Sequence, residues 1–234
     1  MEAKMKKIIL ISTFSLIAFF FYCLEPPRPF EIDNLKQNGE FNKRSEFAKS
    51  LKNHKLKLKG RGEKVASEKG LPTSGNPKIF VLLIDFLDYP HTIDASLIQS
   101  MIFGEGNSAN FPYESLTSYY RRSSYGKLNI QGDLFGWYRA SNRRDYYTNN
   151  AEGLIEDAIA YYHSQGQRFD KYDNDGDGEV DYFAVFWTGP DTGWASFWWG
   201  WQSYFGDYDY LIDGKRLGAF SWQWEEDNPG TIIH

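Results

Sequence analysis

The sequence is poor in the residues that most often cross-link a chain or bind metal: it has one cysteine and four histidines in 234 residues. The single Cys23 excludes an internal disulfide, so a domain of this size must take its rigidity from a large apolar core or from bound metal. Neither His91 nor His163 has a second histidine at ligand spacing, so we expect both to be surface or structural residues. No serine-centred nucleophile elbow and no phosphate-binding loop is present, which argues against those catalytic classes.

Long hydrophobic runs are also scarce. The run over residues 8–22 directly follows a short lysine-rich start, which is the pattern of an export signal. It is shorter than the roughly 20 apolar residues of a membrane-spanning helix, but no small-residue cleavage site precedes Cys23. Residues 1–22 are therefore predicted to be a signal peptide or a membrane anchor. We expect a secreted, extracellular protein whose only membrane contact would be through a retained 8–22 segment.

The net charge of −5 hides an asymmetry, because residues 1–64 hold 14 Lys and Arg against 7 Asp and Glu. The basic residues between Lys43 and Lys64 lack the regularly interleaved aromatic side chains of a single-strand-binding surface, so an exposed linker is favoured and no nucleic-acid partner is expected. After the prolines at 26–29, the segment up to about Gly75 is polar, and its large apolar residues occur only singly, as at Leu51, Leu56 and Leu58. This is too little apolar surface for a separate fold. Residues 23–76 are predicted to be a polar linker segment.

The composition changes at Pro77, where a nearly continuous apolar run over 78–86 predicts a strand buried on both faces. Apolar spacing and capping residues predict helices over 95–103, from about Ser115, and over 151–163. Further strands are predicted at 128–130, 136–138 and 182–187, with the first two joined by a turn at Gly132. The mixed order over residues 77–234 predicts an α+β domain, a mixed sheet with packed helices.

The most specific local signal is the acidic loop DNDGDGEVD at 173–181. Alternate side chains of such a tightly curved loop converge on one point, and a hard cation takes six to eight oxygens, so a structural calcium ion is predicted. Its predicted ligands are Asp173, Asp175, Asp177, the backbone carbonyl of Glu179, and Asp181. The twelfth position is Ala184, so the bidentate glutamate of a full EF-hand loop is missing, and another residue or water would complete the shell. The alternative is a solvated acidic turn, which the repulsion among these carboxylates disfavours.

Seven of the eight tryptophans lie between Trp187 and Trp224. Aromatic clusters most often fill cores, although they also stack on sugars or clamp peptides. Packing within the core is the favoured interpretation, and a cleft-lining role for part of the stretch stays open.

Several short sequence motifs follow one another after residue 77: VLLIDF (81–86), DYP (88–90), FGEG (103–106), YYRRSSYGKL (119–128), YDNDGDG (172–178), WTGP (187–190) and SWQW (221–224). In wording and order they resemble the start of the immune inhibitor A family of secreted metallopeptidases. The resemblance covers about residues 77–234. It implies a zincin-like domain, a zinc cofactor, and protein or peptide substrates, with residues 23–76 as a propeptide or spacer.

In that family a His-Glu-x-x-His helix supplies two zinc ligands and the general base. By position, His234 matches the first of those histidines, but the glutamate, the second histidine and the downstream ligand are not in the sequence. The resemblance therefore implies an incomplete zinc site without catalytic residues, in the amino-terminal fragment of a zinc metalloendopeptidase that is inactive in this form. Without the zinc helix we expect part of the sheet and some tryptophans to be uncovered. The rival hypothesis is a catalytically dead, secreted, calcium-stabilised module that binds a protein or a glycan.

Overall fold

The computed structural model describes residues 27–60, 70–106, 114–227 and 229–233 of the protein. The predicted signal or anchor over 1–22 and the predicted zinc ligand His234 lie outside these residues. Within them, no helix combines the length and the apolar character needed to cross a membrane.

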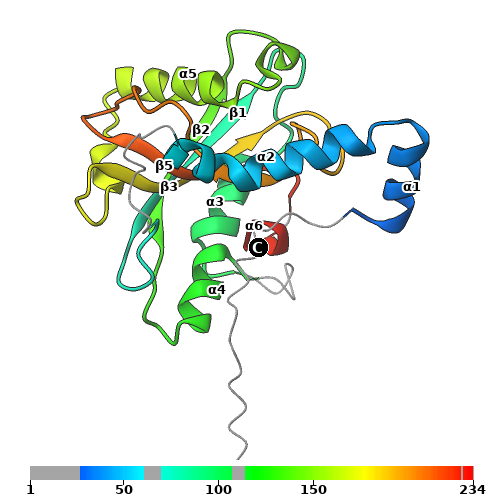
Figure 1. Cartoon of the computed structure of the whole chain (residues 1–234). Helices are drawn as coiled ribbons and strands as arrows, with labels where there is room; N and C mark the ends of the chain where they lie inside the picture. The colour runs from blue at the N-terminus through cyan, green and yellow to red at the C-terminus, as the bar shows by residue number, and fades with distance from the viewer. Residues whose placement is uncertain (1–26, 61–69, 107–113, 228, 234) are drawn as a thin grey trace, which may run out of the picture.

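A five-stranded sheet in the order β2-β1-β3-β5-β4 forms the centre of the molecule (Figure 1). Its strands are β1 (Lys78–Asp85), β2 (Gln131–Arg139), β3 (Glu179–Trp187), β4 (Trp201–Tyr204) and β5 (Arg216–Trp224). β1 pairs in parallel with β2 and β3, and β3 pairs in parallel with β5, whereas β4 pairs with β5 in the antiparallel sense. The expected α+β fold with a mixed sheet is therefore confirmed.

Helices cover both faces of this sheet (Figure 1). The helices of the described residues are α1 (Pro29–Gln37), which lies beyond the sheet beside α2, and α2 (Phe41–Gly60), α3 (Ala95–Phe103), α4 (Leu116–Ser123), α5 (Ala151–Ser164) and the short α6 (Pro229–Ile233). One side of the sheet carries α5, and we call it the α5 face. The other side carries α3, α4 and α6, and we call it the α4 face.

Strand β1 explains why the sheet is covered on both sides, because seven of its eight residues are buried. Successive side chains of a strand point to opposite faces. Phe80, Leu82 and Ile84 accordingly join the large core cluster with α5, whereas Val81 and Leu83 join a second cluster with α3. The predicted helix over 95–103 coincides with α3, and the predicted strand over 78–86 is β1 with one residue removed.

The predicted turn at Gly132 is wrong. Residues 131–139 form the single strand β2, and Gly132 pairs with Ile79 within it. A side chain there would place its Cβ 1.9 Å from the Ile79 carbonyl oxygen, so the glycine allows two backbones to approach closely.

The polar segment before residue 77 contributes two helices, α1 and α2, and α2 contacts β4. None of the residues 27–51 is buried, so α2 is held by its contacts with the sheet, and α1 by its contacts with α2, rather than by a core of their own. This agrees with the low apolar content of the segment.

The tryptophan-rich stretch fills the core, as favoured from the sequence. Trp187 and Trp222 are fully buried, and Trp198, Trp199 and Trp201 are 5–8% exposed. The rings of Trp187, Trp198, Trp201 and Trp222 contact one another and Phe197 in the large cluster on the α5 face, which also contains Trp199.

Candidate functional site

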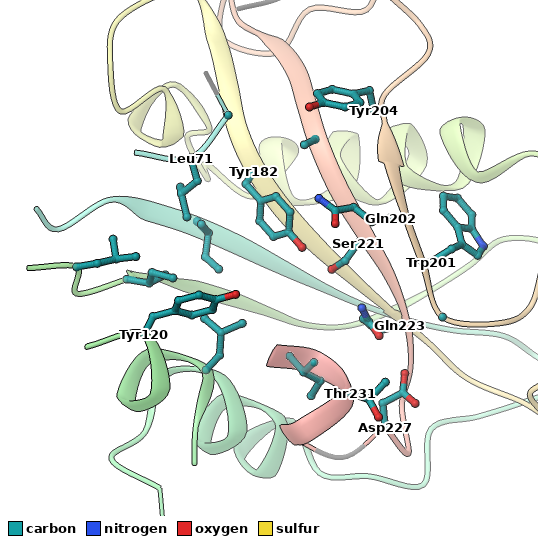
Figure 2. A pocket seen from close by; sticks show the side chains of 18 of the residues that line it. Leu71, Tyr120, Tyr182, Trp201, Gln202, Tyr204, Ser221, Gln223, Asp227 and Thr231 are labelled. Atoms are coloured by element: carbon teal, nitrogen blue, oxygen red, sulfur yellow. The ribbon is translucent and has the colours of Figure 1, made fainter. Parts of the chain in front are cut away.

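A pocket of about 420 Å³ opens on the α4 face (Figure 2). Its floor is formed by β3, β5 and β4, which present Tyr182, Ser221 and Gln202 on the same side of the sheet. Leu116 and Tyr120 of α4 form one wall, and Leu128, Ile130 and Ile79 extend that wall with apolar surface. Figure 2 shows the side chains of Gln202, Ser221 and Gln223 gathered on the strands, facing Tyr120 and Tyr182.

Helix α6 closes one end of this pocket. Thr231 and Ile232 line it, and Ile232 also packs against the core cluster that contains Ala184 and Phe186. α6 has five residues, which is much shorter than a helix that is stable on its own. Its contacts with α3 and α4 hold it at the pocket.

The polar lining of the pocket is not fully paired. The side-chain oxygen Oε1 of Gln223 is buried and accepts no hydrogen bond from the described residues. An unsatisfied buried acceptor costs free energy, so such a group marks a place where a further partner is expected. Burial also raises the pKa of Tyr182 to about 12, against a hydrogen bond with Ser221 that acts in the opposite direction. The Tyr182 phenol is therefore neutral at ordinary pH and serves as a hydrogen-bonding group.

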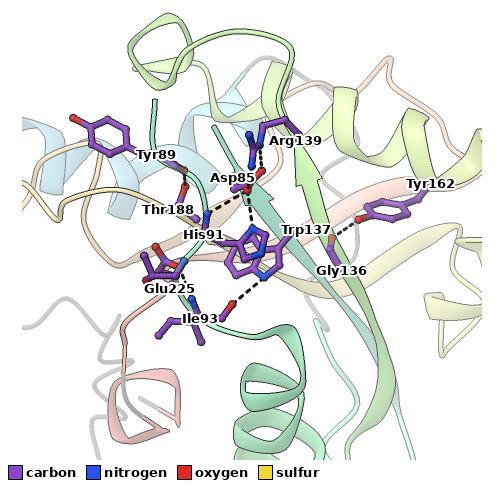
Figure 3. Close-up of polar contacts among 11 residues, drawn as sticks. Asp85, Tyr89, His91, Ile93, Gly136, Trp137, Arg139, Tyr162, Thr188 and Glu225 are labelled. Carbon is purple, nitrogen blue, oxygen red and sulfur yellow. Dashed lines mark hydrogen bonds and ion pairs between the residues drawn. The ribbon is translucent and has the colours of Figure 1, made fainter. Parts of the chain in front are cut away.

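A second cluster lies at the carboxyl ends of the parallel strands (Figure 3). Asp85, at the end of β1, is 1% exposed. It accepts hydrogen bonds from Arg139 Nε at 2.5 Å and Nη2 at 2.7 Å, and from His91 Nδ1 at 2.7 Å. Burial opposes ionisation of Asp85, but the bonds from Arg139 and His91 outweigh it, so its pKa lies below the ordinary value. Asp85 is thus an ionised anchor with its oxygens already occupied.

The rest of this cluster fixes the loop that follows β1. The ring of His91 stacks on Trp137 with the centroids 4.8 Å apart, and Trp137 Nε1 donates to the Ile93 carbonyl at 3.0 Å. Buried Glu225, after β5, accepts from the backbone amides of Thr92 and Ile93 at 2.9 and 3.3 Å. His91 therefore has a structural role, which is one of the two alternatives predicted for it. His163 likewise pairs with a carboxylate, that of Asp213, at 3.0 Å.

Arg144 is a buried charge that the sequence did not single out. It is 4% exposed, and its guanidinium lies 4.2 Å from the ring centroid of Trp198 and 5.0 Å from that of Trp187. Its Nη2 donates to the Pro190 carbonyl at 2.7 Å. Burial lowers the pKa of Arg144 to about 10, so it remains charged and is held by cation–π contacts.

The acidic loop brings together three of the five predicted calcium ligands. Oxygen atoms of Asp173, Asp175 and Asp177 all lie within 4.8 Å of one another. Asp181 instead accepts from the backbone and side-chain nitrogens of Asn174 at 2.9 and 2.8 Å. The Glu179 side chain is buried against Gly218. The predicted calcium ligand of this residue is its backbone carbonyl, not the side chain.

Asp173 already has cationic and amide partners. Lys215 Nζ lies 2.6 Å from its Oδ2, and the amides of Gly176 and Gly178 donate to its two oxygens at 2.8 and 3.0 Å. Burial of Asp173 acts against these bonds, but they prevail and lower its pKa. Burial, followed by the charges of Asp175 and Asp177, raises the pKa of Asp181, although hydrogen bonds from Asn174 oppose this. A cation at this loop would compete with Lys215 for Asp173.

The acidic side chains of the described residues suit calcium better than zinc. Within the described ranges, Asp173, Asp175 and Asp177 form the one group of three or more histidine, cysteine or acidic side chains close enough to share an ion. Carboxylate oxygens alone suit a hard cation such as calcium, whereas zinc sites use histidine or cysteine. The described residues therefore do not fit a zinc ion, and no hydrolytic step can be derived from them.

Comparison with known proteins points to metallopeptidases. No protein-family model matches the chain. It is 32% identical over 103 residues to the pre-pro-metalloprotease PrtV of Vibrio cholerae serotype O1, in strain M66-2 and in strain ATCC 39315 / El Tor Inaba N16961. The match covers 36% of this chain and 11% of each relative, so the chain spans only a small part of their length. This similarity supports a relationship to metallopeptidases, and it does not single out the immune inhibitor A family.

The pocket residues were not found from the sequence. Gln202, Ser221 and Gln223 lie within the tryptophan-rich stretch, where the aromatic residues dominate the pattern. The alternation of polar and apolar residues along SWQW was the available signal, because it places Ser221 and Gln223 on one face and Trp222 on the other.

Proposed function

We propose that this chain is the amino-terminal part of a secreted zinc metallopeptidase domain of the immune inhibitor A type, and that these 234 residues do not hydrolyse peptides by themselves. The observation that carries the proposal is the 32% identity to a metalloprotease precursor. The sequence motifs described above support the narrower family, and the apolar segment over 8–22 supports export.

The geometry of the α4 face is consistent with this proposal. Helix α6 ends beside a pocket that has an apolar wall on α4 and an unpaired acceptor on Gln223. A helix that continued from α6 along the pocket would bury that wall and could donate to Gln223. In the proposed family such a helix carries the zinc ligands, with His234 as the first, and zinc would there activate water for attack on a peptide bond.

Zinc content and proteolysis test the proposal together. The purified chain ending at His234 should lose zinc on dialysis and leave casein intact, because a catalytic zinc needs three protein ligands and a water. The matched comparison is the product of the same gene read beyond the codon for His234. An in-frame Glu-x-x-His continuation that restores one zinc and chelator-sensitive hydrolysis would support the proposal. Retention of one equivalent of zinc and casein hydrolysis by the 234-residue chain would overturn it.

A binding module is the second candidate. The pocket favours it by presenting Gln202 and Ser221 together with the ring of Tyr182, a mixture of polar and aromatic groups that suits a glycan or a peptide. A stop codon directly after His234, together with stable expression and saturable binding of a glycan or peptide at this pocket, would favour the module over the enzyme fragment.

We further propose that the acidic loop holds a structural calcium ion through Asp173, Asp175 and Asp177. The motivation is the convergence of three carboxylates on one point, which a divalent cation would neutralise. Calcium should then raise the melting temperature of the wild type, and the Asp175→Ala variant should lose this increase. Asp209→Ala removes an equal charge from another exposed loop and should keep it. An Asp175→Ala variant with the full calcium response would remove the loop from the proposal.

A further inference from the structure

One arginine and two phenylalanines hold helix α2 against the loop at residues 192–194 and against strand β4. Phe41, Arg44 and Phe47 follow one another at intervals of three residues, so they lie along one side of the helix. The Phe41 ring stacks on Trp194 with centroids 6.1 Å apart, and the Phe47 ring meets Trp201 edge-on at 6.3 Å. Figure 1 shows α2 crossing in front of the sheet, and the helix contacts the edge strand β4.

Arg44 binds three successive backbone carbonyls. Its Nη1 donates to the oxygens of Thr192, Gly193 and Trp194 at 3.2, 3.0 and 3.0 Å. Peptide carbonyls of consecutive residues normally point in different directions, so their convergence on one nitrogen requires an unusual backbone. This loop has one, with positive φ angles at Gly193 (86°) and Ala195 (53°).

The loop holds this shape through bonds that do not involve α2. The Asp191 carboxylate accepts from the Gly193 amide at 2.8 Å, and the Thr192 amide donates to the Trp198 carbonyl at 2.9 Å. The Thr192 hydroxyl also donates to Ser196 Oγ at 2.7 Å. The carbonyl cluster is therefore preformed, and it offers a ready site for a cationic side chain.

The contacts of α1 and α2 are shallow compared with those of the sheet. No residue between 27 and 51 is buried, whereas every strand of the sheet contains buried side chains. Segments with few buried contacts open at a lower free energy than the core, and they open as cooperative units. The two helices are thus suited to leave the sheet without unfolding it.

We propose that loop 191–194, with Trp194 and Trp201, is a receptor for a helix that carries an arginine between two aromatic residues, and that α2 occupies it as a latch. The latch, residues 29–51, opens as a unit. When closed, it covers the aromatic surface and shields the edge strand β4, which would otherwise offer unpaired backbone groups to another chain. The latch does not depend on zinc or on peptidase activity.

Hydrogen exchange of the full chain tests this latch. Replacing Arg44 with alanine should speed amide exchange in residues 41–51 by about tenfold or more, because charge-assisted hydrogen bonds to the receptor are lost. Exchange in β4 should rise less, and exchange in β1 and β3 should not change. Lys43→Ala removes an equal charge from an exposed position on the same helix, and it should behave as the wild type.

Phe47→Leu provides a second variant that keeps an apolar side chain, so the test does not depend on how well Arg44→Ala folds. It should also accelerate exchange selectively in residues 41–51, by a smaller factor. Wild-type exchange of α2 in both variants, or equal acceleration in α2, β1 and β3, would overturn the latch. Protection of residues 191–201 that increases with protein concentration would identify a second copy of the chain as the occupant, and it would overturn the intramolecular assignment.

Discussion

The two faces of the sheet are built from alternate residues of the same strands, yet only one of them is closed. On the α5 face, Phe80, Phe183 and Phe220 stack in series across three strands, with ring centroids 4.8 and 5.3 Å apart. On the α4 face, the neighbouring positions Tyr182 and Ser221 line a pocket. The strands alone therefore do not determine which face of the sheet is filled by packed side chains and which keeps a pocket.

The difference lies in what covers each face. Helix α5 has five buried residues, which form a continuous apolar stripe that packs against the strands. The α4 face has α3, α4 and only the short α6, and it keeps a pocket of about 420 Å³. We infer that the α5 face carries stability and the α4 face is where further structure or a ligand would bind.

Replacing Phe183 with alanine should have the largest effect and gives the sharpest test of this comparison. The side chain is fully buried between two stacked rings, so its loss should cost about 3–5 kcal/mol of unfolding free energy, from lost burial and a new cavity. Tyr182→Ala, one residue earlier, removes a ring that already borders open space, and it should cost about 1–2 kcal/mol.

Denaturant unfolding of both variants under the same conditions provides the comparison. Equal losses of stability would mean that the α4 face is as closed in solution as the α5 face, and that the pocket does not exist as described.

The second prediction concerns Asp85, at the strand ends that both faces share. Asp85→Asn keeps the shape but leaves Arg139 and His91 without their carboxylate. We expect a loss of about 2–3 kcal/mol at neutral pH, less than for a fully buried ion pair, because the Arg139 side chain is 45% exposed.

The pH dependence follows from the lowered pKa of Asp85. A carboxyl group with a depressed folded pKa contributes its full stability above its unfolded pKa of about 3.9, and it loses that contribution as the pH falls through the folded value. The gap between wild type and Asp85→Asn should therefore be constant near neutrality and shrink below about pH 4. Urea unfolding as a function of pH measures it, with exposed Asp170→Asn as the control. A gap that does not shrink in acid would show that ionisation of Asp85 is not the source of stability.

The sequence predicted the closed face better than the open one. The apolar run of β1, the stripe of Leu154, Ile155, Ala158 and Ile159 on α5, and the packing of the tryptophans all depend on residue type and spacing. These predictions agree with the structure because burial of apolar side chains in the core favours the same helices and strands as residue type and spacing do.

The sequence did not predict the features that depend on contacts between distant segments. Gly132 was assigned to a turn because glycine is common there, whereas its role depends on the Ile79 backbone. The carbonyl cluster around Arg44 depends on a loop nearly 150 residues away. The acidic loop is intermediate: its spacing placed Asp173, Asp175 and Asp177 together, but nothing local indicated that Asn174 would bind Asp181 or that Lys215 would reach Asp173.

The smallest expected effect concerns the helix that walls the pocket. Ser115 is buried and caps α4, because its hydroxyl accepts from the Ser118 amide at 3.0 Å and also donates to the Gly104 carbonyl. Ser115→Ala should cost about 1 kcal/mol, a normal value for the loss of an N-cap. Ser123→Ala, at the exposed end of the same helix, should change stability very little. A peptide or glycan that fills the pocket should raise the melting temperatures of the wild type and of both serine variants by mass action. A compound that does not bind there should leave all three melting temperatures unchanged. Thermal unfolding of the two serine variants, with and without a candidate peptide or glycan, therefore distinguishes a pocket that binds a ligand and is stabilised by it from a gap between elements that binds none.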